Sequence, residues 1–268
     1  MKSSRSDTSV LPGAPMRQDA PQALLIAYVL IAPLLVCWLA RGAQADPVCS
    51  DVALVLAVDT SASVSSGEFL LEKRGIAVAF RDPTVLKAIE RAGKVMVSAV
   101  FWGDDDMPKT QSNWVSLDDQ SGADQFARDL EVTPRQVTGD TGLGAGLATA
   151  LAKIMSPDVC AVRKIINVSG DGEESSAVRG KHRSPLPSQV RDLATMANVE
   201  INALSISNDN PELAQYYSRN VITGPDAFVM DVHEYTGFAD AIRRKLIREI
   251  SPRAVSELPP LPEIERLN

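Results

Sequence analysis

Short apolar runs alternate along the chain with stretches in which apolar residues recur every three or four positions. The apolar runs predict strands at 52–58, 94–101, 164–169, 200–206 and 227–231, and a short edge strand at 114–117. The amphipathic stretches predict helices at 66–82, 85–91, 121–131, 187–198 and 236–250, one that follows the loop around 141 and ends at 155, and a short one that starts at 210–211. This alternation indicates an α/β fold with a doubly wound, mainly parallel six-stranded sheet flanked by helices.

Hard oxygen donors follow the first buried strand. Asp59, Ser61 and Ser63 form an Asp-x-Ser-x-Ser sequence directly after the strand at 52–58. Ligands of open α/β sheets bind at the carboxyl ends of the strands, and hard oxygen atoms suit cations such as Mg²⁺, Mn²⁺ or Ca²⁺. The sequence therefore predicts a cation site here. The alternative is an N-capping turn, because Asp and Ser are common helix caps.

Two later segments carry similar side chains to comparable positions. Residues 138–144 open the helix that ends at 155, and they contain both Thr138 and Thr141. Asp171 stands between two glycines after the strand at 164–169. Taken alone, Asp171 followed by glycine is also typical of a tight turn. The three segments together form a much more specific pattern than any one of them.

In this combination the chain resembles the von Willebrand factor type A family over residues 49–250. The metal-ion-dependent adhesion site of that family consists of an Asp-x-Ser-x-Ser loop, a Thr in a second loop and an Asp in a third. The matching residues here are Asp59, Ser61, Ser63, Thr141 and Asp171. Thr141 is preferred to Thr138 because Gly144 and Leu147 follow it as in the family pattern. Within the family, the chain is most similar to exported single-domain bacterial members of uncharacterised function.

The resemblance implies a binding or adhesion domain rather than an enzyme. Three hydroxyl groups would give the ion neutral ligands and two aspartates would supply charge, so one coordination position would stay open for an Asp or Glu carboxylate of a partner protein. Magnesium, which retains waters in an octahedral shell, suits such an open site, and Mn²⁺ or Ca²⁺ are the alternatives. In this family, movement of the last helix, here 236–250, can be coupled to the metal site.

The N-terminal region predicts export. Residues 23–40 are apolar and uncharged, Arg17 precedes them, and Ala43-Gln44-Ala45 follows them. This is the pattern of a signal peptide cleaved after Ala45, and it predicts a periplasmic or secreted domain at 46–251 with no membrane attachment and a Pro-rich tail at 252–268. The alternative is an uncleaved N-terminal helix that anchors the protein, because the apolar stretch is just long enough to span a membrane.

The resemblance also implies a disulfide between Cys49 and Cys160. In the family's sheet the strands that carry the two aspartates are parallel neighbours, and Cys49 and Cys160 precede those aspartates by nearly equal distances. Neighbouring strands lie about 4.8 Å apart, which is within disulfide reach. The bridge would stabilise the fold by roughly 4–5 kcal/mol in the chain-entropy model.

Charge and motifs argue against several other functions. The net charge is −7, and an acidic domain is a poor match for nucleic acid. A metal-dependent, phosphatase-like hydrolase is the alternative function, but Ser61 stands where such an enzyme has a second Asp as general acid, and a Gly-x-Ser-x-Gly elbow is missing from the sequence. A third hypothesis, a subunit that assists a metal-handling ATPase or chelatase, conflicts with the leader because those partners are cytoplasmic.

A few further residues have two interpretations. The run 104–106 of three aspartates could bind a second cation, but it is also typical of a solvated acidic turn. Trp102 is expected to pack in the interior, and Glu173 and Glu174 to lie in a solvated turn or helix start. The basic residues at 179–183 could attract an acidic partner or form a charged loop. His182 and His233 have no zinc spacing, and no role is predicted for them.

Overall fold

The structure is a computed structural model that describes residues 49–176 and 184–252. The described part contains one sheet of seven strands, in the order β3-β2-β1-β5-β6-β7 with β4 also paired to β2. The strands are β1 (Ser50–Asp59), β2 (Val95–Trp102), β3 (Thr110–Gln111), β4 (Val115–Ser116), β5 (Ala161–Gly170), β6 (Val199–Ile206) and β7 (Val229–Val232). The predicted signal peptide, the basic stretch 179–183 and the Pro-rich tail beyond 252 lie outside the described residues.

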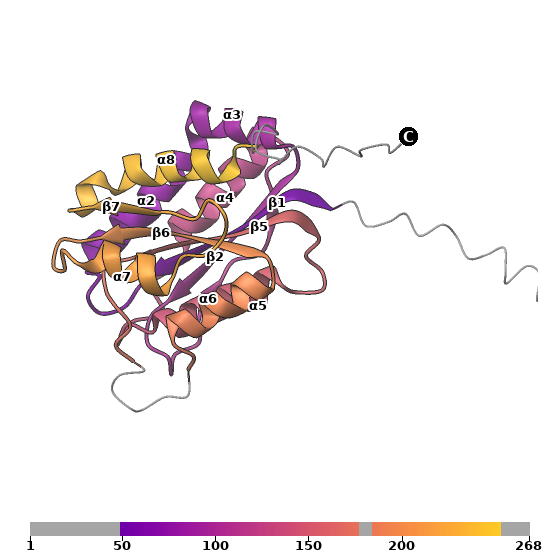
Figure 1. Cartoon of the computed structure of the whole chain (residues 1–268). Coiled ribbons are helices and arrows are strands. Elements are labelled where there is room, and N and C mark those ends of the chain that lie inside the picture. The colour runs from indigo at the N-terminus through magenta and orange to yellow at the C-terminus, as the bar shows by residue number, and fades with distance from the viewer. Residues whose placement is uncertain (1–48, 177–183, 253–268) are drawn as a thin grey trace, which may run out of the picture. The chain divides into compact units, whose positions relative to one another are not determined.

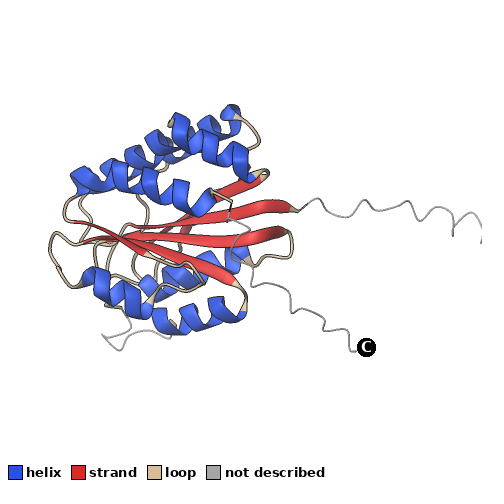
Figure 2. Ribbon diagram, turned by 45° about the horizontal axis from the view of Figure 1, so that its top comes forward, coloured by secondary structure: helices blue, strands red, loops and turns tan. Residues whose placement is uncertain are grey.

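Helices cover both faces of this sheet (Figures 1 and 2). One layer contains α2 (Ser66–Arg81), α3 (Pro83–Ala92), α4 (Gln120–Val132) and α8 (Phe238–Ile250), which the 3₁₀ turn η2 (Tyr235–Gly237) precedes. The other layer contains α5 (Leu143–Ile154), α6 (Pro187–Met196) and α7 (Leu213–Asn220). Over the described ranges, none of the helices has the length and apolar character needed to cross a membrane.

The predicted fold class is confirmed, with one difference in the sheet. The strand count is seven rather than six, because β3 pairs antiparallel with β2 in addition to β4. The expected edge strand at 114–117 is β4, whereas β3 was not predicted. A two-residue strand is too short to show the alternation of apolar and polar residues from which strands are recognised.

Local sequence explains where the helices of the first layer begin. Ser65 starts α2 through a capping box, in which its side chain accepts from the Glu68 N–H and the Glu68 carboxylate accepts from the Ser65 N–H. This arrangement satisfies two backbone donors that the first turn of a helix leaves open. Asp82 then ends α2 and caps α3, and Pro83 occupies the first turn of α3, where its missing N–H is not needed.

The central strand β1 is buried on both sides and places Asp59 at its end. Leu54 and Leu56 pack with the layer that contains α2 and α8. Ala53 and Val55 pack with the layer that contains α5. Strands β2 and β5 run parallel to β1 on either side of it. The carboxyl ends of these three strands therefore lie together at one edge of the sheet, where the predicted site residues follow them.

The predicted disulfide is present at the opposite, amino-terminal end of the same strands. Cys49 and Cys160 are bonded, with their Cα atoms 4.7 Å apart. The backbone N–H of Ser50 also donates to the carbonyl oxygen of Cys160. The bridge thus joins the starts of β1 and β5, the strands whose ends lead to Asp59 and Asp171.

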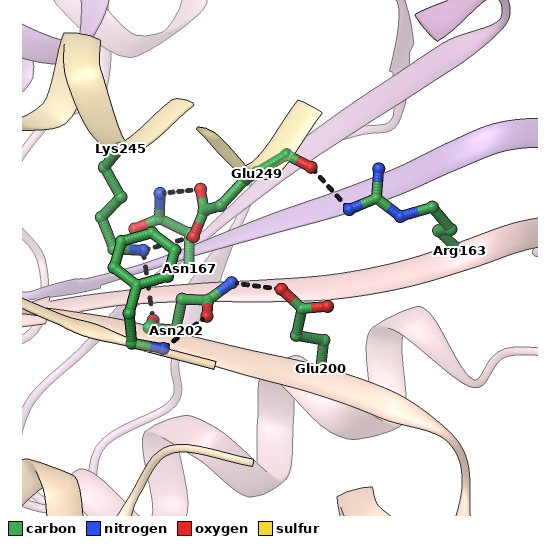
Figure 3. A network of polar contacts seen from close by, with 7 residues as sticks. Arg163, Asn167, Glu200, Asn202, Lys245 and Glu249 are labelled. Atoms are coloured by element: carbon green, nitrogen blue, oxygen red, sulfur yellow. Dashed lines mark hydrogen bonds and ion pairs between the residues drawn. The ribbon is translucent and has the colours of Figure 1, made fainter. Parts of the chain in front are cut away.

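A buried polar network holds α8 on the sheet (Figure 3). Lys245 is fully buried, forms an ion pair with Glu249 one turn later in α8, and donates to the carbonyl oxygen of Asn202 in β6. Glu249 also accepts from the side chain of Asn167 in β5 at 2.8 Å. Arg163 of β5 donates to the carbonyl oxygen of Glu249 at 2.8 Å. The last helix is therefore attached to two strands by charged and amide groups as well as by apolar packing.

Candidate metal site

Three loops at the carboxyl edge of the sheet bring the five predicted side chains together. Asp59, Ser61 and Ser63 follow β1, Thr141 precedes α5, and Asp171 follows β5. The Thr141 hydroxyl donates to Ser61 Oγ at 3.5 Å, and Ser61 Oγ lies 3.0 Å from Ser63 Oγ. The hydroxyl of Ser63 then donates to Asp171 Oδ1 at 2.6 Å. Asp59 joins this chain through its Oδ1, which accepts from the N–H of Ser61 at 2.8 Å.

The loop after β1 is fixed by its backbone as well as by its side chains. Thr60 donates to the carbonyl oxygen of Trp102 through both its N–H, at 2.7 Å, and its hydroxyl, at 2.8 Å. The N–H of Ala62 donates to the carbonyl oxygen of Gly139 at 2.7 Å. The end of β2 and the loop that carries Thr141 therefore both hold the Asp-x-Ser-x-Ser segment in place.

The carboxyl groups of the site are buried near each other. Asp59 has no exposed surface, and its Oδ2 is buried without a hydrogen-bond partner among the described residues. Burial raises the pKa of Asp59 to about 7, and the nearby charge of Asp171 adds to this effect. Burial also raises the pKa of Asp171, while its hydrogen bonds from Ser63 and Tyr235 act to lower it. Without a cation, the site therefore holds two carboxyl groups that resist ionisation.

These residues fit a hard divalent cation. They offer two carboxylates and three hydroxyls, which are the oxygen ligands that Mg²⁺, Mn²⁺ and Ca²⁺ take. The unpartnered Oδ2 of Asp59 is a buried acceptor that a cation would satisfy. Within the described ranges, no three or more His, Cys, Asp or Glu side chains are grouped so that they could hold a metal ion. The fit thus depends on the three hydroxyl groups, which the sequence pattern singles out.

The structure separates the two threonines and shows how the acidic turn is arranged. Thr138 is exposed, and its carbonyl oxygen accepts from the N–H of Asp104, whereas the Thr141 side chain is nearly buried against Ser61.

The ammonium group of Lys109 donates to the carbonyl oxygens of Asp104, Asp105 and Met107. The run 104–106 therefore folds around a lysine of its own loop.

Glu174 is not solvated, contrary to what the sequence leads us to expect, whereas Trp102 packs in the interior as expected. Glu174 is only 8% exposed, and its Oε2 accepts from the N–H of Gly144 at 2.7 Å, in the first turn of α5. The expectation of a solvated residue was wrong for Glu174, because Gly142 at the N-cap of α5 has no side chain that could cap the helix. Trp102 is fully buried in the core, as expected.

Three residues near the site were not singled out from the sequence. Tyr235 donates to Asp171 Oδ2 at 3.0 Å, just before α8 begins. Arg135 donates to the carbonyl oxygens of Thr60 and Ser61. Glu72 of α2 is fully buried, and within the part of the chain that the structure describes neither of its carboxylate oxygens has a hydrogen-bond partner.

Of these three residues, only Glu72 could have been singled out from the sequence. It stands between Phe69 and Ile76 on the apolar face of α2, where a carboxylate is exceptional. Burial raises the pKa of Glu72 well above its ordinary value, with further contributions from the charges of Asp59 and Asp171. Tyr235 and Arg135 reach the site only through the tertiary fold.

Comparisons with known proteins agree with this fold. The pilus adhesin SpaC from Lactobacillus rhamnosus GG is similar at a TM-score of 0.55 and 15% identity, over 75% of this chain and 30% of that one. Proximal thread matrix protein 1 from the mussel byssus, in a structure with a zinc-occupied MIDAS motif, is similar at 0.54 and 16% identity, over 75% of this chain and 46% of that one. This chain thus spans less than half the length of either protein. No curated protein matches the chain.

The chain has the von Willebrand factor type A fold. The chain belongs to the family described as Protein of unknown function (DUF1194), whose model matches residues 48–254.

Proposed function

We propose that this protein is an exported binding domain of the adhesion type that uses a divalent cation to bind a partner protein. The proposed ligands of the cation are Asp59, Ser61, Ser63, Thr141 and Asp171. The observation that carries the proposal is the chain of hydrogen bonds that links the side chains of Thr141, Ser61, Ser63 and Asp171, which Asp59 joins through the backbone N–H of Ser61. Mg²⁺ is the proposed ion, and Mn²⁺ or Ca²⁺ are the alternatives.

The donor set explains why such a site would bind a carboxylate. The hydroxyls of Ser61, Ser63 and Thr141 add no charge, and aspartates that act partly through bound water would neutralise a divalent ion incompletely, so one coordination position would stay open. When bound, the cation supplies the positive charge that attracts an Asp or Glu side chain of the partner. Tyr235 donates to Oδ2 of Asp171, which leaves Oδ1 to accept from the hydroxyl of Ser63.

A binding role is favoured over the hydrolase alternative. A phosphatase-like reaction needs a general acid at the second acidic position, and Ser61 occupies that position. The fold shared with a pilus adhesin and with a protein that has a zinc-occupied MIDAS motif supports a binding domain.

Export through a signal peptide cleaved after Ala45 is part of the proposal, with a domain at 46–251 and a tail at 252–268. The bonded pair Cys49–Cys160 supports it, because disulfides form and persist in oxidising compartments. Such a location would be the periplasm or the exterior of the cell.

Isothermal titration of the purified domain with Mg²⁺ tests the proposed ligands. We expect the wild type to bind Mg²⁺, and Asp59→Ala and Asp171→Ala to abolish this binding, because each removes half of the charge that faces the ion. Asp158→Ala is the matched control, since Asp158 is exposed in the loop that leads to Cys160, away from the site. Mg²⁺ affinity that is unchanged in both site variants would refute the assignment.

Capture of partners tests the binding role itself. The immobilised domain is incubated with periplasmic extract in the presence of Mg²⁺ and again with EDTA. We expect at least one protein to be retained only with Mg²⁺ and to be lost from the Asp59→Ala variant. Turnover of generic phosphate esters with Mg²⁺ would instead favour the hydrolase alternative.

A further inference from the structure

The side chain of Arg135 reaches back to the loop that carries three of the proposed ligands. Arg135 lies in the segment between α4 and α5, six residues before Thr141. Its Nε and Nη2 donate to the carbonyl oxygen of Thr60 at 3.2 and 3.0 Å, and Nη2 also donates to the carbonyl oxygen of Ser61 at 2.5 Å. The guanidinium group therefore holds two consecutive peptide groups of the Asp-x-Ser-x-Ser loop.

These two peptide groups are the ones that flank the side chain of Ser61. The Ser61 hydroxyl is the centre of the site, because it contacts both Ser63 Oγ and Thr141 Oγ1. The N–H of Ser61, which belongs to the peptide group of Thr60, donates to Asp59 Oδ1. An anchor on the carbonyl oxygens of Thr60 and Ser61 therefore fixes the direction of that N–H and of the Ser61 side chain at once.

The anchor also joins two loops that are distant in sequence. The segment that supplies Arg135 continues to Gly139, whose carbonyl oxygen accepts from the N–H of Ala62, and then to Thr141. One segment thus carries a proposed ligand and braces the loop of three others at two points. Two loops that are fastened to each other in this way keep their oxygen atoms close together without help from the cation.

We propose that Arg135 is a positioning residue that preorganises the metal site, because its planar guanidinium group clamps the peptide groups on either side of Ser61. The inference rests on the proposed function for its effect on metal affinity, whereas the clamp itself is a property of the metal-free protein. Support of ligands by surrounding hydrogen bonds typically changes metal affinity by about 10–100-fold.

The clamp needs the geometry of arginine and not only its charge. The guanidinium group presents several N–H donors in a fixed plane, whereas lysine carries a single ammonium group on a flexible stem. Arg135→Lys therefore keeps the positive charge near the site and loses the two-carbonyl contact. Arg128→Lys is the matched control, because Arg128 lies on the exposed side of α4, where it donates to the side chain of Gln125 in the same helix.

Two measurements on the whole domain test the inference. Hydrogen exchange in EDTA follows the amides of Ser61, Ala62 and Val64, which are hydrogen-bonded in the loop. Titration with Mg²⁺ gives the affinity of each variant. In Arg135→Lys we expect at least tenfold faster exchange at these amides and Mg²⁺ affinity weaker by about 10–100-fold. Exchange in the core of β1 and β5 should match the wild type, as should both readouts in Arg128→Lys.

The outcomes distinguish this inference from the proposed function. Unchanged exchange in Arg135→Lys overturns the clamp. Faster exchange with unchanged Mg²⁺ affinity overturns its role in preorganising the metal site. If exchange is faster in Arg135→Lys but the wild type binds no divalent ion, the clamp is retained and the proposed metal-dependent function is refuted.

Discussion

At the scale of single residues, the chemistry of the site is governed by carboxyl groups in a buried position. Asp59 is fully enclosed, its Oδ2 accepts no hydrogen bond from any described residue, and Asp171 lies nearby. An ionised carboxylate in such a place is destabilising unless a positive charge compensates it. Folding without a cation therefore favours the protonated form of Asp59, and a bound divalent cation reverses this preference.

The stability of the metal-free protein should depend on pH through Asp59. Folding raises the pKa of Asp59 from 3.8 to about 7. Because the folded protein binds this proton more tightly, Asp59 adds to the free energy of unfolding. This stabilisation is complete below about pH 4 and is lost as the pH rises to about 7. The difference of about 3 pKa units between the unfolded and folded protein corresponds to about 4 kcal/mol in the free energy of unfolding.

Urea unfolding in EDTA between pH 4 and pH 8 measures this contribution. Asp59→Asn is the reference, because it imitates the protonated form and does not titrate, while all other groups still contribute. We expect the wild type to lose stability relative to Asp59→Asn as the pH rises, and to regain it when Mg²⁺ replaces EDTA. A difference between the two proteins that stays constant with pH contradicts the account.

The proposed ligands could be named from the sequence, and the residues that support their loops could not. Asp59, Ser61 and Ser63 directly follow a recognisable strand, so the pattern itself proposes them as ligands. Arg135 and Tyr235 act through contacts with segments at least 64 residues away, and sequence spacing carries no information about such contacts. Glu174 has a capping role that depends on the position of another loop.

At the scale of elements, α8 combines an amphipathic sequence with a buried ion pair. The sequence predicted its apolar side correctly, because Phe238, Ile242 and Leu246 are buried. It did not reveal that Lys245 and Glu249 are buried as well, since charged residues one turn apart in a helix are usually exposed. Burial lowers the pKa of Lys245 and raises that of Glu249, and their mutual contact acts against both shifts.

Removing one member of this pair should destabilise the fold strongly. Lys245→Met leaves the Glu249 carboxylate buried without its counter-ion, which typically costs about 3–5 kcal/mol. The double variant Lys245→Met/Glu249→Leu should cost less than the sum of the single variants, because no uncompensated charge remains.

Chemical denaturation of the four proteins in this double-mutant cycle measures the coupling. Arg244→Met is the control, because Arg244 pairs with Asp240 at the exposed surface of the same helix and should change stability by less than about 1 kcal/mol. If Lys245→Met lowers the free energy of unfolding no more than this control does, a structural role for the buried pair is contradicted.

At the scale of the whole molecule, the parallel sheet is what converts distant sequence motifs into one site. Strands β1 and β5 are neighbours although Asp59 and Asp171 are more than a hundred residues apart. The same pairing places the bridge Cys49–Cys160 at one end of the two strands and the site at the other. The fold class was predictable from the alternation of strands and helices along the chain, and the disulfide from the family resemblance, which implies that the two strands are neighbours. The two-residue strand β3 was not, because its pairing depends on tertiary contacts rather than on local pattern.

The central claim is that the five oxygen-bearing side chains hold one divalent cation. The most direct measurement is a crystal structure of the domain grown with Mn²⁺, with anomalous scattering used to locate the metal. The account predicts a single strong peak among the hydroxyls of Ser61, Ser63 and Thr141 and the carboxylates of Asp59 and Asp171, with each group in contact directly or through a water. A fully occupied Mn²⁺ ion elsewhere in the domain, with none at this position, would contradict it.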